Sequence, residues 1–268
     1  MIIRGCRKAV TAAVLLSGAL LAGCGGGMTR SDMEDNTGSM GKENPANSGA
    51  GEVYAQLAVA YLRNGQTAIA LQQAKKSLEV EPGNASGHNI IAVIYTRLRE
   101  YKLAEHHFLK GLDAQPKNSY LRNAYGTFLC DRQRYKEASE QFRLALENPL
   151  NQSPEVALTN AGICERLSGD QKKAEEYLAQ ALRANPIFPM ALLEMAEIKL
   201  RKEEYLSARA YLQRYLEVAN HTSASLWIGI RTERMLGDQD AVASYALNLR
   251  NNFPDSQENL LLIESENK

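Results

Sequence analysis

A period of 34 residues runs through most of the chain and constrains its fold more than any other feature of the sequence. Six segments share one register, with two extra residues after the third: 51–84, 85–118, 119–152, 155–188, 189–222 and 223–256. Small side chains recur at the eighth position of five segments, as Ala58, Ala92, Gly126, Gly162 and Ala196. Position 20 repeats alanine in the same five segments, and position 32 is most often proline. Such a repeat indicates a stacked array of similar units.

The recurring small residues and prolines predict a pair of helices in each segment. Small residues stand where two helices must touch, and proline ends the second helix because it has no backbone N–H to donate. This is the tetratricopeptide pattern, in which each helix pair leaves an apolar face for the next pair to cover. We therefore predict an all-α fold, a right-handed superhelix of six tetratricopeptide repeats with a C-terminal capping helix within 257–268. The sixth segment is the least regular, because Ile230 and Val242 occupy small-residue positions.

The first 23 residues have the layout of a secretory signal. Three basic residues precede an apolar run over 9–22, and this run is too short to cross a bilayer. The run ends in LAGC at 21–24, which matches a lipobox, so we predict a signal peptide over 1–23 and a lipid on Cys24. The alternatives are an ordinary signal peptide that leaves Cys24 as a free thiol, or a weak anchor helix.

Residues 24–50 are predicted to be the lipidated cysteine and a flexible tether. The stretch 25–50 contains no valine, isoleucine, leucine or aromatic residue, so it cannot bury a core. Lipoprotein sorting in double-membrane bacteria generally retains aspartate at the second mature position in the inner membrane, and here that position is Gly25. We therefore expect a lipid-anchored protein of the bacterial outer membrane, with its repeats facing the periplasm.

The charge balance argues against nucleic acid as a partner. The whole chain has 31 basic and 31 acidic residues, and removal of the three basic residues in 1–23 leaves a net charge near −3. A protein that binds nucleic acid usually presents a basic stripe to the phosphates. We therefore expect no nucleic-acid partner.

The sequence contains no recognised catalytic or metal-binding motif. Its four histidines are not spaced with cysteine or with each other as metal ligands are, and we expect His106 and His107 on a solvated helix surface. A nucleophile elbow, a dinucleotide fingerprint and a kinase motif are all missing. We expect no enzyme activity and therefore no catalytic residue, metal, cofactor or small-molecule substrate.

The remaining functional candidate is a concave face formed by the first helices of the repeats. Positions 2, 5, 9 and 12 of the segments should line it, which gives an apolar floor with a few polar groups. Such a groove suits an extended or helical segment of a partner protein; the alternative is that several of these side chains only pack against neighbouring helices. The predicted groove residues are Val59, Leu62, Val93, Tyr120, Asn123, Ile163, Arg166, Leu193, Trp227 and Arg231.

Two stretches go beyond a generic repeat. They read NAYGTFLCDRQRYKEASEQFRLALENP with NAGICERLSGDQKKAEEYLAQALRANP, and SLWIGIRTERMLGDQDAVASYALNLRNNFPDS. Over about 53–256 the chain resembles the type IV pilus biogenesis lipoproteins of the PilF/PilW family, the pilotins that act on the outer-membrane secretin. The resemblance implies that Cys24 carries the lipid and that the repeats bind the secretin subunit and promote its outer-membrane localisation, multimerisation or stability. The alternatives are a tetratricopeptide adaptor for barrel assembly or cell-wall hydrolases, and an envelope enzyme with an unrecognised site.

Cys130 and Cys164 are the cysteines that remain besides Cys24 after processing. They lie on the predicted first helices of the third and fourth repeats, within the stretches that carry the resemblance, and export places them in an oxidising compartment. We predict a disulfide between them. The alternative is a pair of buried free thiols, because the two-residue insertion puts the cysteines at different positions of the repeat.

Overall fold

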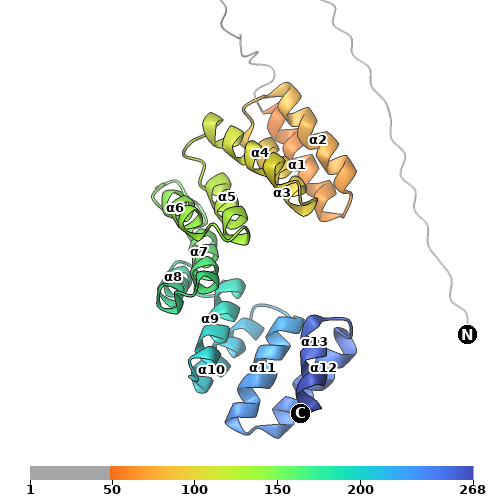
Figure 1. The fold of residues 1–268 in the computed structure, drawn as a ribbon, viewed down its shortest axis with the longest axis vertical. Helices are drawn as coiled ribbons and strands as arrows, with labels where there is room; N and C mark the ends of the chain where they lie inside the picture. The colour runs from red at the N-terminus through yellow and green to blue at the C-terminus, as the bar shows by residue number, and fades with distance from the viewer. Residues whose placement is uncertain (1–48, 268) are drawn as a thin grey trace, which may run out of the picture. The chain divides into compact units, whose positions relative to one another are not determined.

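The computed structural model describes residues 49–267, which form six helix pairs followed by a single helix (Figure 1). The helices are α1 Ala50–Arg63, α2 Thr67–Val80, α3 Ala85–Arg97, α4 Tyr101–Ala114, α5 Ser119–Asp131, α6 Tyr135–Leu146, α7 Pro154–Ser168, α8 Gln171–Ala184, α9 Pro189–Arg201, α10 Tyr205–Leu216, α11 Ser223–Leu236, α12 Gln239–Asn252 and α13 Gln257–Glu266. None of these helices is both long and apolar enough to span a bilayer. The predicted signal peptide, Cys24 and nearly all of the predicted tether lie outside the described residues.

Successive helix pairs stack along the array (Figure 1). The two helices of each pair pack on each other, and the first helices of successive pairs are also neighbours, from α1 against α3 to α9 against α11. The last helix, α13, packs on α11 and α12, and its Leu262 is fully buried there. The Ser256 hydroxyl caps α13 by accepting from the Asn259 N–H at 3.2 Å. The predicted all-α superhelix of tetratricopeptide repeats with a capping helix is confirmed.

The 34-residue register is visible in the backbone at the turn inside each repeat. Position 15 has a left-handed conformation in all six repeats, with φ between 60° and 99°. These residues are Gly65, Arg99, Gln133, Gly169, Glu203 and Gly237. Glycine adopts this conformation without a steric cost, whereas a residue with a Cβ atom is strained there by about 1–2 kcal/mol. Three of the six turns therefore carry local strain.

In the third and sixth repeats the side chains at positions 8 and 24 have complementary volumes. Gly126 lies so close to Phe142 that a Cβ atom on residue 126 would come within 2.8 Å of the ring. The sixth repeat reverses this arrangement, because Ile230 at position 8 is fully buried in the same cluster as Ala246 at position 24. Its irregular sequence is therefore a compensated exchange of a large and a small side chain, which preserves close packing.

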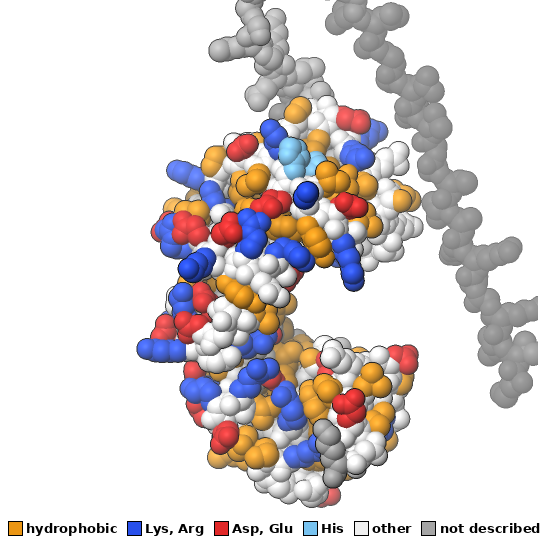
Figure 2. Space-filling view, in the orientation of Figure 1, with side chains coloured by type: hydrophobic (Ala, Val, Ile, Leu, Met, Phe, Trp, Pro, Cys, Tyr) orange, Lys and Arg blue, Asp and Glu red, His pale blue; other side chains and the backbone are white. Residues whose placement is uncertain are grey.

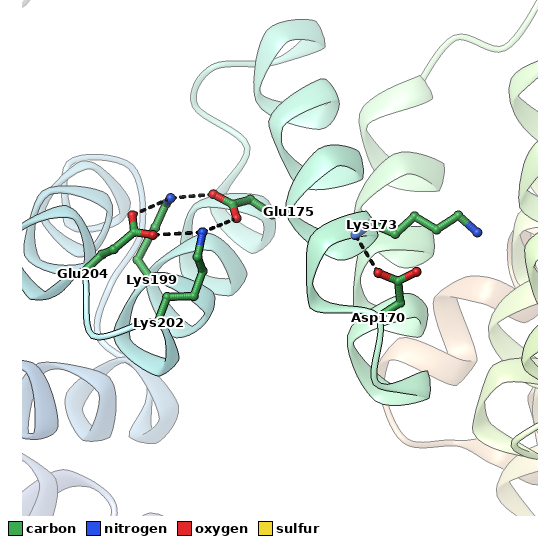
Figure 3. Close-up of polar contacts among 6 residues, drawn as sticks. All are labelled: Asp170, Lys173, Glu175, Lys199, Lys202 and Glu204. Atoms are coloured by element: carbon green, nitrogen blue, oxygen red, sulfur yellow. Dashed lines mark hydrogen bonds and ion pairs between the residues drawn. The ribbon is translucent and has the colours of Figure 1, made fainter.

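An ion-pair network joins the fourth and fifth repeats (Figure 3). Glu175 on α8 lies 2.5 Å from Lys199 Nζ and 2.9 Å from Lys202 Nζ. Both lysines also reach Glu204, which precedes α10, at 2.7 Å and 2.9 Å. Each of the four charges thus has two partners of opposite sign, an arrangement that is worth more than isolated surface pairs. In the same view Asp170 caps α8 by accepting from the Lys173 backbone N–H at 3.0 Å.

The third and fourth repeats are joined by the longest link between described helices, from Leu146 to Pro154. A disulfide between Cys130 on α5 and Cys164 on α7 crosses this junction, with the two Cα atoms 5.8 Å apart. That separation is within the range of about 4.4–6.8 Å that a disulfide needs. The structure thus brings together the two cysteines predicted to bond, and formation of the bond in the exported protein is a prediction developed below.

Candidate partner-binding groove

The first helices of the repeats carry all ten residues that were predicted to line the groove. Nine of them are partly buried, and Tyr120 near the start of α5 is 67% exposed. A partly buried side chain can contact both a neighbouring helix and a ligand, so burial alone does not separate these roles. Two cavities on this part of the array show which of the ten side chains border open space.

The first cavity, of about 230 Å³, is lined by residues of α1, α3 and α5. Its lining is Val59, Leu62, Arg63, Asn89, Ile90, Val93, Arg97 and Tyr120. Four of these residues were predicted, and three of the four supply apolar surface. Asn89 stands at position 5, one of the four positions predicted to line the groove. It is 4% exposed, and its Oδ1 has no hydrogen-bond partner among the described residues. An unpaired buried acceptor costs about 1–3 kcal/mol.

A second cavity, of about 560 Å³, adjoins the first, since Tyr120 lines both. It contains the predicted Asn123 together with residues of the link between α6 and α7 that were not predicted. In this link Leu150 is 82% exposed. Asn148 Nδ2 holds the link in place by donating to the Lys117 carbonyl at 2.7 Å. Two features of the sequence mark this link as unusual. They are the two-residue insertion and the leucine at position 32, which is usually proline.

Every charged residue that lines the two cavities is cationic, namely Arg63, Arg97 and Lys117. In the view of Figure 2, by contrast, basic and acidic side chains are interspersed over the surface of the array. Complementary charge guides and orients a bound partner. The lining of these cavities therefore favours a ligand with acidic groups beside apolar ones.

The other five predicted residues line neither cavity: Ile163, Arg166, Leu193, Trp227 and Arg231. Arg166 on α7 donates to Glu194 on α9 at 3.0 Å, and Arg231 on α11 pairs with Glu197 on α9. The Arg231 guanidinium also lies 5.6 Å from the centre of the Trp227 ring. The two ion pairs join successive first helices, so the structure accounts for the two arginines by packing within the array. It does not bring them to the residues around Tyr120.

His107 is partly buried against His88, and the expectation that it lies on a solvated surface was wrong. The Nδ1 atoms of the two rings are 3.1 Å apart, and His88 Nε2 lies 3.0 Å from the Pro82 carbonyl. Burial and the neighbouring His88 lower the pKa of His107 to about 4. His106 is exposed, and histidine side chains are visible in pale blue in Figure 2. No group of three potential metal ligands occurs within 49–267.

Comparison with known proteins identifies the repeat type and a close relative. A tetratricopeptide repeat family model matches residues 56–119 and 168–224. The type IV pilus assembly protein PilF of Pseudomonas aeruginosa is 30% identical over 223 residues, which cover 81% of this chain and 88% of PilF. The similarity therefore extends over most of both proteins.

Solved structures agree with this relationship. A structure of Pseudomonas aeruginosa PilF has a TM-score of 0.72 at 31% identity and covers 82% of this chain and 99% of its own. PilW, a widely conserved type IV pilus biogenesis factor, has a TM-score of 0.71 at 30% identity, with 80% and 98% covered. A tetratricopeptide repeat protein from Parabacteroides merdae, with a TM-score of 0.62, 17% identity, and 83% and 86% covered, shares the fold alone. The resemblance inferred from the sequence is confirmed, and the chain belongs to the family of the type IV pilus assembly protein PilF.

Proposed function

We propose that this protein is a lipid-anchored pilotin of the outer membrane, which binds the type IV pilus secretin subunit and promotes its localisation, multimerisation or stability. The observation that carries the proposal is 30% identity with PilF across 81% of the chain. Membership of this family supports a role in type IV pilus biogenesis. Our proposal adds two specific points to this role: the partner is the secretin, and the location is the outer membrane.

The proposed mechanism uses binding alone and needs no catalytic residue, metal or cofactor. The two cavities around Tyr120 have room for side chains of a bound segment, as grooves that recognise peptides do. The lipid on Cys24 anchors the array, since several acyl chains hold a protein on a bilayer far more firmly than one. A subunit captured in the groove is then carried to the membrane in which it assembles.

Co-purification from detergent-solubilised envelopes tests this proposal. The tagged full-length protein should retain the secretin subunit, and Tyr120→Asp should retain much less, because it places a negative charge between two cavities that favour acidic ligands. Tyr120 is 67% exposed, so the substitution should not unfold the array. Leu206→Asp is the matched control, because Leu206 is 70% exposed on α10 and lines neither cavity.

Three outcomes are informative. Recovery of the secretin by the wild type and by Leu206→Asp, with loss in Tyr120→Asp, would support both the partner and its site. Recovery of a barrel-assembly subunit or a cell-wall hydrolase in place of the secretin would favour the adaptor function. Equal recovery of the secretin by all three proteins would support the partner and exclude the groove as its site.

A further inference from the structure

The last helix, α13, exposes an apolar face at the end of the array. The outer face of a terminal unit meets water and is usually polar. Leu260, Leu261 and Ile263 are instead between 38% and 57% exposed, while Leu262 is buried against α11 and α12. A helix that is apolar on all sides is normally covered on all sides. Nothing in the part of the chain that the structure describes covers this outer face of α13.

Acidic side chains flank the apolar face of α13. Glu258 and Glu264 both stand on this helix, and neither carboxylate forms an ion pair with a cation among residues 49–267. Glu264 follows Leu260 by four residues, so these two side chains are neighbours on one side of the helix. The outer surface of α13 therefore combines apolar groups with unpaired negative charge.

The groove formed by the two cavities around Tyr120 has the complementary chemistry. Its apolar lining includes Val59, Leu62, Val93 and Leu150. Its charged lining residues are Arg63, Arg97 and Lys117. None of these three cations forms an ion pair with a carboxylate in the described part of the chain. A helix face that is apolar and acidic matches both properties of this lining.

The arrangement of the array makes this contact intermolecular. Within one chain α13 packs on α11 and α12. The groove is lined by α1, α3, α5 and the link after α6, towards the other end of the array (Figure 1). Because each repeat contacts mainly its neighbours, the folded array does not bring its own α13 to its own groove. A second copy of the chain can supply this helix.

We propose that the groove around Tyr120 binds the outer face of α13 from a second copy of this protein. Leu260 and Ile263 are three residues apart, so they share one side of the helix and supply the apolar contacts. Glu258 and Glu264 meet the unpaired cations of the groove. The inference goes beyond the proposed function: the docked helix covers the surface assigned there to the secretin segment, so self-association and capture of that segment exclude each other.

Co-purification of two differently tagged copies tests the inference. Both copies are the full-length lipidated protein, extracted together in a large excess of detergent so that two copies rarely share a micelle by chance. Ile263→Lys removes an apolar anchor and brings a positive charge to the cationic groove, and Tyr120→Asp brings a negative charge to the groove that receives the glutamates. Each variant should recover at least tenfold less of its own second copy than the wild type does.

Two further variants serve as control and as confirmation. Leu206→Lys is the matched control, because Leu206 is exposed on α10 and lines neither cavity, and it should behave as the wild type does. Leu260→Lys changes a second exposed residue of α13 and should lose self-association as Ile263→Lys does. Thermal melts followed by circular dichroism show which variants are folded, and a folded variant of either residue suffices for the test.

Mixing the two main variants identifies the surfaces in contact. A Tyr120→Asp copy keeps a native α13, and an Ile263→Lys copy keeps a native groove. One native contact can form between them, so the mixed pair should co-purify although neither variant recovers its own second copy. Mixing would not restore a contact of α13 with α13, or of one groove with another.

Several results would overturn the inference. These are a wild type that does not recover its second copy, folded α13 variants that self-associate as the wild type does, equal loss in Leu206→Lys, or a mixed pair that does not co-purify. The secretin is scored in the same eluates, which keeps the two proposals distinguishable. Self-association without the secretin would refute the proposed partner alone, and retention of the secretin without self-association would refute this inference alone.

Discussion

Replacing Cys130 and Cys164 together by alanine should destabilise the array by about 4 kcal/mol. The two cysteines are 34 residues apart in the sequence. Closing a loop of this length removes about 13 cal/mol/K of entropy from the unfolded chain, which corresponds to about 4 kcal/mol at 25 °C. This is a large share of the stability of a typical domain, which is about 5–15 kcal/mol.

The position of the disulfide makes a second effect testable. It joins α5 to α7 across the longest link between the described helices. Each repeat in such an array is stabilised mainly by its neighbours, so loss of this bond should weaken the coupling between the third and fourth repeats. We therefore expect the urea transition of the double variant to be broader than that of the wild type as well as earlier.

Urea unfolding followed by circular dichroism measures both effects. The wild type in dithiothreitol should unfold as the double variant does, and the double variant itself should not respond to dithiothreitol. Thiol titration of unfolded, unreduced periplasmic protein should detect neither cysteine. Two reactive thiols besides Cys24, or a wild-type midpoint that reductant does not move, would show that no stabilising disulfide forms.

Three further predictions concern the turns, the histidine pair and the lipid anchor. Gly169→Ala should lower the free energy of unfolding by about 1 kcal/mol, because φ is 99° there, whereas Gln133→Gly at the equivalent turn should not; urea midpoints of the opposite order would contradict the shared register. The array should lose stability as the pH falls from 6.5 to 4, since the pKa of His107 is about 4 in the folded protein and 6.5 is its ordinary value, so the unfolded chain binds more protons there. His107→Gln should have a shallower pH dependence of its melting temperature, and equal slopes would refute this. Cys24→Ala should release a folded array into the periplasm, and continued fractionation with the outer membrane would mean that the lipid is not the anchor. Gly25→Asp should move the protein to the inner membrane, and no shift would oppose the sorting argument.

The architecture could be predicted because the stacking of repeats acts on the same positions in every unit. Gly126 must be small because Phe142 lies against it, and this constraint recurs with the period. The repeat pattern alone does not show whether a large residue at a small-residue position is compensated by a small residue opposite it. Ile230 looks irregular until its counterpart Ala246 is placed in the same cluster, and that requires knowing which columns face each other.

The candidate site could be predicted only in part, because insertions and pairwise contacts break the period. Leu150 replaces the proline that is usual at its position, which marks the link as irregular, but the repeat pattern does not place Leu150 or Asn148 beside Tyr120. Asn89 stands at a groove position, but its unpaired Oδ1 depends on what surrounds it in three dimensions. His107 is shielded by His88 of the preceding helix. A periodic pattern carries no information on contacts of this kind.

The quantity of assembled secretin multimer in a strain lacking this protein shows whether the protein acts as a pilotin. Envelope proteins would be separated without boiling, and the multimer and the monomeric subunit would be quantified by immunoblot against total subunit. We expect the multimer to fall sharply, to be restored by the wild type, and not to be restored by Tyr120→Asp. Normal multimer levels in the deletion strain would exclude a role of this protein in secretin assembly.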